Sequence, residues 1–293
     1  MSSEYLRPAS LPEALKALAS AGPAARIIAG GSDLMVELRQ RRLHGQELPG
    51  LLVDVAGLPE LQGARLQDGG LWLGAGLTFS QCQEDALIGA RLPLLAEAAR
   101  TVGSRQIRNV ATLGGNLGNL SPAADGVTVL AGLGATAFLA SPDGRRPAAV
   151  EDLAAQGLLP GEIIVGFHVP APACPTAAAF RKVIRRQAVG IARFNLAVQL
   201  DLEDQGAIAA ANIGVGAVFP SPRRVGEAEA LLRGQKPSPG LWAGAALALA
   251  QAMLKACGQR PSMVYKEPAL TRVAARTLAL AWRRGLASRE ARS

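Results

Sequence analysis

The segment from Gln106 to Asp125 constrains this chain most, because it sets two adjacent glycines among hydroxyl and amide side chains. It begins Gln-Ile-Arg-Asn-Val-Ala-Thr-Leu-Gly-Gly-Asn and ends Ser-Pro-Ala-Ala-Asp, an order typical of a helix start. Glycine pairs let backbone N–H groups come close to a ligand, and a helix N-terminus adds the positive end of its dipole. The segment therefore suits a cofactor that carries phosphate, although on local physics alone a purely structural role fits it equally well.

A second glycine pair stands earlier, in residues 29–33 (Ala-Gly-Gly-Ser-Asp). Between a strand and a helix, such glycines can turn successive N–H groups toward one phosphate. The loop lacks the Gly-x-Gly-x-x-Gly spacing of a dinucleotide fingerprint, and alone it fits a tight turn without a ligand equally well. Two such loops suggest one ligand with two phosphates held between them.

Hydrophobic periodicity predicts an α+β fold in several parts. In the first sixty residues, a helix after the Ser10 capping box, strands near 26–29 and 51–55 and a helical turn at 33–38 predict a small parallel α/β unit. After a linker at 171–175, strands followed by helices predict a second α+β unit. The other expected strands are 71–76, 135–140, 162–169, 180–184, 195–202 and 207–219, and the other expected helices are 93–102, from Ser121 to about Gly132, 224–233, 238–257 and 266–286.

Cysteine and histidine are too sparse for a metal centre. The three cysteines have no C-x-x-C pairing, which argues against an iron–sulphur cluster or a cysteine zinc site built from this chain alone. Neither His44 nor His168 has a metal-ligand neighbour at helical or strand spacing. We expect no metal site, and the odd, sparse cysteines favour a reducing compartment.

The net charge is +8, with arginine far more frequent than lysine. The basic residues are spread out and are not interleaved with aromatic ones, which argues against nucleic-acid binding. An arginine-rich surface that serves solubility and a surface that docks on an acidic partner both remain open. The N-terminus has no signal-peptide pattern, and apolar runs are interrupted before about 18 residues. We therefore expect a cytoplasmic protein with no membrane span.

The two glycine loops follow one another in the order found in a known family. The chain resembles the FAD-binding subunit of molybdenum hydroxylases, the family of xanthine dehydrogenase and carbon monoxide dehydrogenase. Residues 26–34 resemble the family's first flavin loop, with Ser32 where threonine is more usual, and residues 106–125 resemble its second loop. Looser similarities follow at 161–164, at Phe180 and Lys182, and in the turn 220–223. The resemblance covers essentially the whole chain, and the second loop is its most specific part.

The resemblance implies a two-subdomain FAD-binding domain of the vanillyl-alcohol-oxidase or PCMH type over residues 1–172. Its parts would be a parallel α/β subdomain at about 1–58 and a mixed or antiparallel sheet with helices at about 59–172. A small C-terminal α+β domain, like that of the carbon monoxide dehydrogenase flavoprotein, is expected over 176–287. The diphosphate of FAD would lie between the two glycine loops.

The residues that match the family's flavin contacts are those of the two loops and a few later positions. Asp125 resembles the acidic residue near the adenosine ribose, although a carboxylate there also suits the helix dipole. The implied cofactor-binding residues are Arg26, Ile27, Ile28, Ala29, Gly30, Gly31, Ser32, Asp33, Leu34, Ala111, Thr112, Gly114, Gly115, Asn116, Asp125, Ile163, Phe180 and Lys182.

One turn departs from the family's pattern. Where relatives have Arg-x-Ala-Met-Asp-Ile-Ser, residues 186–192 are Arg-Gln-Ala-Val-Gly-Ile-Ala, so Gly190 replaces the acid and Ala192 the hydroxyl. We therefore expect no polar contact from these two positions. No nucleophile–base pair is evident in the sequence, and we name no catalytic residue.

The resemblance implies an electron-relay subunit. Iron–sulphur clusters of a partner subunit would reduce FAD, a molybdopterin-binding large subunit would oxidise the substrate, and NAD or another acceptor would take up the electrons. Two alternatives remain open from the sequence. One is a self-sufficient FAD-dependent oxidoreductase, which would need its own base or nucleophile. The other is a non-catalytic nucleotide-binding assembly module, which would bind ADP or ATP and no flavin.

Overall fold

The N-terminal segment forms a three-stranded parallel sheet in the computed structural model, which describes residues 3–186, 189–203 and 205–291. β3 (Leu51–Asp54) lies between β1 (Glu4–Leu6) and β2 (Ala25–Ile28) and runs parallel to both. The connections carry α1 (Leu11–Ala21), a short 3-10 turn (Gly22–Ala24) and α2 (Leu34–Leu43). The hydroxyl of Ser10 caps α1 by accepting the N–H of Glu13. The predicted parallel α/β unit is confirmed.

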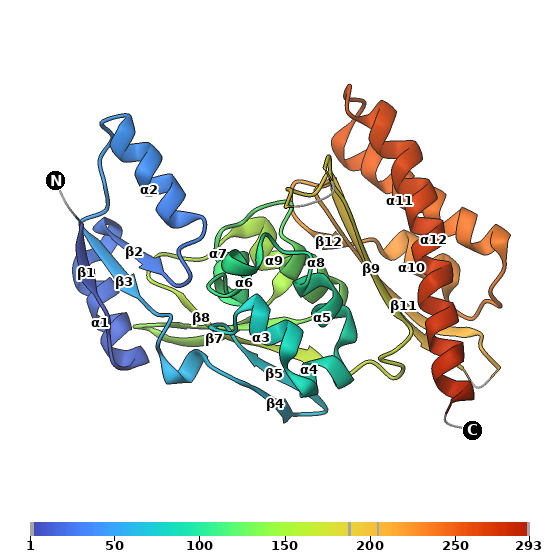
Figure 1. Ribbon diagram of the computed structural model, residues 1–293, viewed down its shortest axis with the longest axis horizontal. Helices are drawn as coiled ribbons and strands as arrows, with labels where there is room; N and C mark the ends of the chain where they lie inside the picture. Colours follow the sequence, from blue (N-terminus) through green and yellow to red (C-terminus); the bar gives the residue numbers. More distant parts are fainter. Residues whose placement is uncertain (1–2, 187–188, 204, 292–293) are drawn as a thin grey trace.

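A five-stranded antiparallel sheet follows in the chain and occupies the middle of the molecule (Figure 1). Its order is β4 (Ala64–Gln67), β5 (Gly70–Gly74), β8 (Ile163–Pro170), β6 (Thr136–Ser141) and β7 (Gly144–Ala149). A 3-10 turn (Pro59–Leu61) precedes it, and its helices are α3 (Phe79–Glu84), α4 (Ala86–Arg91), α5 (Pro93–Ala99), α6 (Arg105–Arg108), α7 (Leu113–Gly118), α8 (Asp125–Gly132) and α9 (Val150–Gln156).

The C-terminal part is a four-stranded antiparallel sheet in the order β12 (Arg223–Arg224), β11 (Ile208–Gly216), β10 (Phe194–Leu202) and β9 (Ala178–Val183). On one face pack α10 (Gly226–Leu232), α11 (Pro239–Cys257) and α12 (Met263–Glu290), which lie to the right in Figure 1. The opposite face packs against α8 and α5 of the preceding part. This sheet therefore has helices on both faces, and its strands contribute to two hydrophobic cores, one shared with α8 and the other with α10, α11 and α12.

Backbone contact at glycines brings α8 close to β11. A Cβ added at Gly214 would lie 2.2 Å from the carbonyl oxygen of Thr128, and one at Gly132 would lie 3.0 Å from the N atom of Gly214. At β9, the carboxylate of Glu97 on α5 accepts hydrogen bonds from the N–H of Phe180 and from the guanidinium of Arg284. Close packing and charge thus both join the two parts.

Two expectations differ from the structure. The helix after Ser121 begins only at Asp125, because the Ser121 hydroxyl accepts the N–H of Ala123 in a turn and does not cap a helix. α11 is also long and apolar enough to span a membrane by length and composition, whereas the sequence predicted no such segment. However, α11 packs against α10 and α12 with residues such as Leu249 and Met253 buried, as in a core helix.

Three residues of expected turns lie outside the described residues. They are Gln187 and Ala188, in the turn that departs from the family's pattern, and Asp204.

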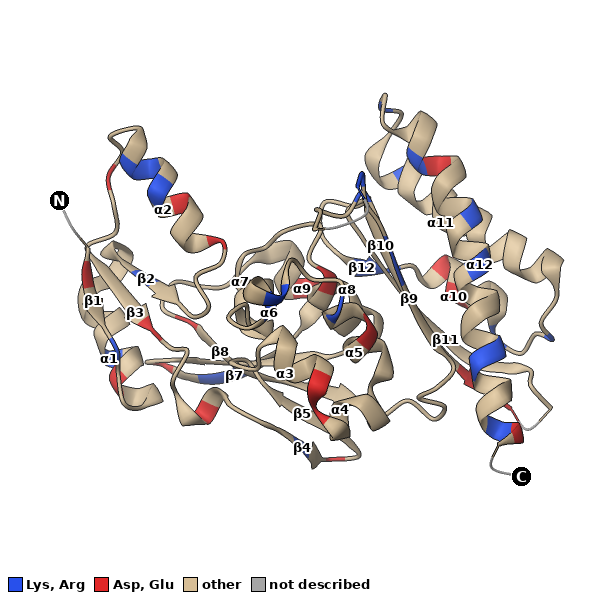
Figure 2. Ribbon diagram, in the orientation of Figure 1, with Lys and Arg blue, Asp and Glu red and all other residues tan. Residues whose placement is uncertain are grey.

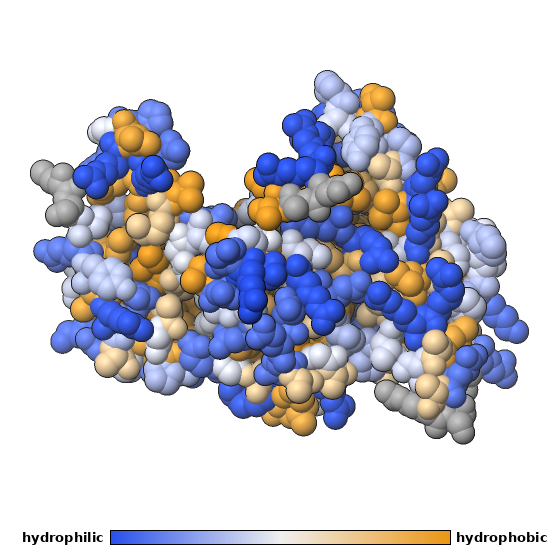
Figure 3. All heavy atoms as spheres, viewed as in Figure 1, coloured by the Kyte–Doolittle hydropathy of each residue, from blue (hydrophilic) through white to orange (hydrophobic). Residues whose placement is uncertain are grey.

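Charged and apolar residues mix over the visible surface. Figure 2 shows lysine and arginine on α2, α6, β9 and α12 instead of along one element. In Figure 3 the space-filling view is hollowed between the lobe that carries α2 and the C-terminal helices, and apolar side chains show in the hollow. The spread of positive charge agrees with the pattern expected from the sequence.

A buried carboxylate joins the edge strand β7 to the start of β8. Both oxygens of Glu162 accept from the guanidinium of Arg146, at 2.5 and 2.8 Å, and Oε2 also accepts the N–H of Leu159 at 2.7 Å. Burial raises the pKa of Glu162, but the bonds from Arg146 and Leu159 outweigh it and hold the pKa below its usual value of 4.5.

Because the pKa is lowered in the folded chain, the charged Glu162 stabilises the fold above pH 4.5 and this contribution is lost as pH falls further. We expect Glu162→Gln to lower the melting temperature by about 2–4 °C at neutral pH, and the difference from wild type to shrink as pH falls below 4.5. Thermal unfolding of the flavin-free chain from neutral pH to below pH 4.5 tests this. A difference that stays constant with pH would contradict the assignment.

Candidate cofactor-binding site

A cavity of about 380 Å³ opens between the parallel α/β unit and the middle sheet with its helices. Most of its wall comes from three stretches of chain, within residues 25–37, 111–119 and 158–164. This volume lies within the usual range of small-molecule sites, roughly 300–1,000 Å³. Of the predicted site residues it brings together Arg26, Ile27, Ile28, Ala29, Gly30, Gly31, Ser32, Asp33, Leu34, Ala111, Thr112, Gly114, Gly115, Asn116 and Ile163.

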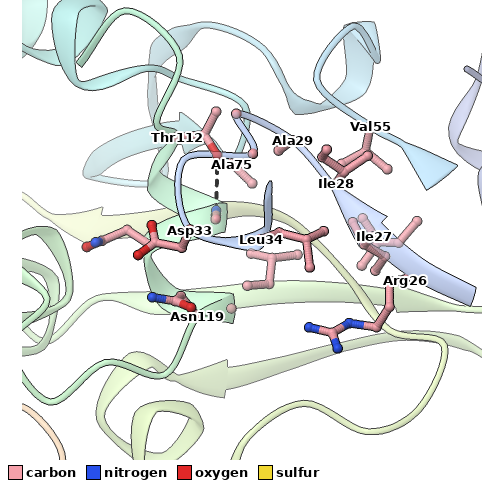
Figure 4. A pocket seen from close by; sticks show the side chains of 18 of the residues that line it. Arg26, Ile27, Ile28, Ala29, Asp33, Leu34, Val55, Ala75, Thr112 and Asn119 are labelled. Atoms are coloured by element: carbon pink, nitrogen blue, oxygen red, sulfur yellow. Dashed lines mark hydrogen bonds between the residues drawn. The ribbon is translucent and has the colours of Figure 1, made fainter. Parts of the chain in front are cut away.

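The first loop lies directly on the second. A Cβ at Gly30 would be only 1.9 Å from the carbonyl oxygen of Val110, so no other residue fits while the two backbones touch. Gly31 has a φ of 65°, a left-handed conformation that glycine adopts without strain. Figure 4 shows the loop turning from Ile28 through Ala29 to Asp33 and Leu34 beside Thr112. Both glycines are thus required by geometry.

The N–H groups of the first loop are available to a ligand. Within the described part of the chain, those of Gly31, Ser32, Asp33 and Leu34 have no hydrogen-bond acceptor. They lie at the N-terminus of α2, where no side chain caps the helix. The hydroxyl of Ser32 donates to the Asp33 carboxylate at 3.0 Å. A row of free donors at the positive end of a helix dipole suits a phosphate group.

The second loop contributes differently from what its glycines predict. Its N–H groups already donate within the protein: Gly114 to the carbonyl oxygen of Ala75 at 2.8 Å, Gly115 to the hydroxyl oxygen of Thr112 at 3.0 Å, and Asn116 to the carbonyl oxygen of Thr112 at 2.9 Å. Its glycines therefore give close packing and an open wall, not free N–H groups. A Cβ at Gly114 would lie 2.8 Å from that of Ala75.

Polar side chains of the second loop remain as donors to the cavity. The Thr112 hydroxyl accepts the N–H of Gly115, so its own hydrogen is left to donate (Figure 4). The Asn116 side-chain oxygen accepts the N–H of Val127 at 3.2 Å, which leaves the NH₂ group for the cavity. Asn119, at the C-terminal end of α7, also lines the wall.

The remaining wall is mostly apolar, with its charged groups paired. Ile27, Ile28 and Ile163 line it together with Leu34. The Arg26 guanidinium lies 3.5 Å from the Glu37 carboxylate, which also pairs with Arg41 at 2.9 Å. Glu162 also lines the wall, and its carboxylate pairs with the Arg146 guanidinium.

Asp125, Phe180 and Lys182 do not line the cavity. Phe180 is buried in the core that includes α8. Both carboxylate oxygens of Asp125 are already engaged, one by the Lys182 ammonium at 2.5 Å and the other by the Asn195 amide at 2.7 Å. Both donors come from the C-terminal sheet, and each carboxylate oxygen can accept a second hydrogen bond. The place of these three residues at the cofactor stays a prediction.

Several lining residues were not predicted. Ala75 and Gly76 follow β5, and the glycine-rich end of that strand (Gly-Ala-Gly) was the available signal. Phe79, Val102 and Ile107 also line the wall, but an apolar side chain in a helix or loop carries no local sign of ligand contact. They come to the cavity only through the packing of the helices on the sheet.

Neither histidine and none of the three cysteines lines the cavity. Among the described residues, no group of three or more histidine, cysteine, aspartate or glutamate side chains could hold a metal ion. Cys82 is buried in the first core, and burial raises its pKa to about 12. The cavity thus offers hydrogen-bond donors and apolar walls to a ligand.

Two family models match the chain. Residues 1–172 match the FAD binding domain in molybdopterin dehydrogenase, and residues 178–279 match the C-terminal domain of the CO dehydrogenase flavoprotein. The nicotinate dehydrogenase FAD-subunit of Eubacterium barkeri is 30% identical over 274 residues, which cover 90% of each chain. A subunit of the 6-hydroxypseudooxynicotine dehydrogenase complex of Paenarthrobacter nicotinovorans is 32% identical, over 98% of this chain and 97% of its own.

Solved structures show the same fold. The carbon monoxide dehydrogenase of Hydrogenophaga pseudoflava superposes with a TM-score of 0.87 at 29% identity, covering 97% of this chain and 98% of the other. Quinoline 2-oxidoreductase from Pseudomonas putida 86 gives a TM-score of 0.85 at 28% identity, with coverage of 97% and 98%. The expected PCMH-type fold with a C-terminal domain is confirmed. With the FAD-domain model matching more than half of its length, the chain belongs to the family of FAD-binding subunits of molybdenum-dependent dehydrogenases, which are oxidoreductases, and its cofactor is FAD.

Proposed function

We propose that this chain is the electron outlet of a heteromeric molybdenum hydroxylase. It receives electrons from the iron–sulphur clusters of a partner subunit and passes them to NAD or another acceptor, while a molybdopterin-binding large subunit oxidises the substrate. Relatives named as the FAD-subunit of a dehydrogenase or as one subunit of a dehydrogenase complex support such an assembly. We place the complex in the cytoplasm.

The cavity lining is the observation that carries the proposal. It presents free donors and apolar walls, and its three carboxylates are occupied, Asp33 by Ser32, Glu37 by Arg41 and Glu162 by Arg146. Among the described lining residues none is a histidine or cysteine, so no nucleophile–base pair faces the ligand. Bound FAD supplies the exchange between one-electron donors and a two-electron acceptor. The protein's task is to bind, orient and shield it.

We assign the two loops separate tasks in holding the cofactor. The free N–H groups of residues 31–34 are the donors for the diphosphate, and the α2 dipole favours its charge. The Thr112 hydroxyl and the Asn116 amide donate to polar cofactor atoms further along, and Ile27, Ile28, Leu34 and Ile163 exclude water. In this proposal the FAD-binding domain covers residues 1–172 and the C-terminal domain 176–287.

Purification of the tagged chain from its native cells tests the electron-outlet role. We expect a flavin absorption band, FAD released on denaturation, and co-purified chains that carry iron, sulphide and molybdenum. Substrate should reduce the flavin in the complex and leave the flavin of the isolated chain oxidised. Direct reduction of the isolated FAD-loaded chain by an organic substrate would instead identify a self-sufficient flavoenzyme. Binding of ADP or ATP without any flavin would identify an assembly module.

Gly115→Val tests the wall that the second loop gives to the cavity. A Cβ at this position meets only the Thr112 hydroxyl oxygen, at 2.9 Å, so the added side chain enters the cavity and disturbs the helix cap. We expect the FAD dissociation constant to rise by about tenfold or more. The control is Gly89→Val in α4, where the added side chain meets open space.

Fluorescence titration with FAD measures both variants, and thermal unfolding of the flavin-free chains checks that they fold. Normal flavin content in Gly115→Val, or an equal loss in Gly89→Val, would refute the contribution of Gly115 to the cavity.

A further inference from the structure

The helix α2 projects from the body of the molecule (Figure 1). Among the described residues, no other helix or strand packs extensively against it, and Leu38 is its one buried residue. An isolated helix shorter than about 12–15 residues is only marginally stable in water, and α2 has 10 residues. Its N-terminus faces the cavity, but most of its length lacks a partner within the described chain.

The two sides of α2 differ in chemistry. Leu34 and Glu37 line the cavity, and the buried Leu38 lies on the same side of the helix. The opposite side, which we name the outer face of α2, is made of exposed side chains at the spacing of one helix face. They are Met35, Val36, Arg39, Arg42 and Leu43. The three apolar ones are 52%, 59% and 70% exposed, and Figure 3 shows apolar side chains among hydrophilic ones on this lobe.

The arginines of the outer face have no acidic partner in the described chain. Glu37 is the one carboxylate of α2, and it pairs with Arg41 at 2.9 Å and with Arg26 at 3.5 Å. No described carboxylate pairs with Arg39 or Arg42. Guanidinium groups bind carboxylates with two hydrogen bonds, and arginine and methionine are enriched in protein interfaces. The outer face therefore complements an apolar groove whose edges carry aspartate or glutamate.

A second copy of this chain and a lipid surface fit the outer face less well. In a symmetric pairing of two such faces, Arg39 and Arg42 would lie against the same arginines of the other copy, and like charges would repel. For a lipid surface, Arg39 lies at the middle of the face, so no continuous apolar stripe is left to insert. The pattern favours a protein groove that offers apolar contact and carboxylates together.

We propose that the outer face of α2 docks a partner subunit of the complex, in an apolar groove of that subunit edged by carboxylates. The helix lies in the groove with Val36, Arg39 and Leu43, at positions i, i+3 and i+7, as the central contacts. The positive charge of the chain, which the sequence left open between solubility and docking, then has a defined place of recognition. This inference rests on the proposed function, which supplies the partner subunits.

Co-purification from native cells tests the docking with the tagged full-length chain. Arg39→Glu/Leu43→Gln reverses the central charge and removes an apolar contact, and both new residues favour a helix. We expect the amount of partner chain recovered per tagged chain to fall about tenfold or more. The matched control is Leu231→Gln/Arg233→Glu at the end of α10, which changes the same residue types at exposed positions. It should leave the recovery within about twofold of wild type.

A zero-length cross-link identifies the groove. In Arg39→Lys/Arg42→Lys the charge of the outer face is kept, and a carbodiimide joins an amine only to a carboxylate in direct contact. We expect the cross-linked peptide from the intact complex to belong to a partner subunit and to carry aspartate or glutamate among apolar residues. Mass spectrometry of the digested complex identifies this peptide.

Several results would overturn the proposal. They are wild-type recovery of partner chains by Arg39→Glu/Leu43→Gln, an equal loss in the α10 control, an intact complex without a cross-link to a partner subunit, cross-links between two copies of this chain, and binding of the wild-type chain to anionic lipid vesicles that the variant loses. If thermal unfolding shows that the variant does not fold, Arg39→Gln/Leu43→Gln replaces it. A wild-type chain that recovers no chain with iron or molybdenum would reject the proposed function itself, and this inference with it.

Discussion

The backbone contact between Gly30 and Val110 is the constraint on which the site depends. The two backbone segments could not come this close if residue 30 carried a side chain, since its Cβ would lie 1.9 Å from the Val110 carbonyl oxygen. This contact places the end of β2 and the N-terminus of α2 against the segment that leads into α7. The cavity exists because the parallel unit is held there, over the helices of the middle sheet. Without it, the free N–H groups of the first loop and the side-chain donors of the second would not face one space.

The division of labour between the loops follows from their hydrogen bonds. The first loop keeps its N–H groups unused at a helix end, an arrangement that costs stability unless an anion or water satisfies them. The N–H groups of the second loop donate within the protein, to Thr112 and Ala75. This loop therefore offers side-chain donors to a ligand. A two-part ligand with a charged diphosphate and a less polar ring system matches that contrast. The helix α8 then links the second loop to the C-terminal domain.

Much of this could be predicted from the sequence because the relevant signals are local. Glycine pairs, the Ser10 cap and the period of the apolar residues predicted the parallel unit and both loops, which the structure brings to one cavity. The hydrogen bonds of the two loops could not be predicted, because they depend on residues far away in the chain. The N–H of Gly114, for example, donates to the carbonyl oxygen of Ala75. The same limit explains Asp125: its place in the first turn of a helix was visible, but its partners Lys182 and Asn195 come from a sheet that only tertiary packing brings to it.

A crystal structure of the chain with FAD bound is the most direct test of the two-loop account. It predicts that diphosphate oxygens lie within hydrogen-bond distance, about 2.7–3.2 Å, of the N–H groups of residues 31–34, with the Gly30–Val110 contact unchanged. It also predicts that the Asn116 NH₂ group faces the flavin while its oxygen stays on Val127. A diphosphate bound away from the first loop, or loops that separate to admit the cofactor, would contradict the account.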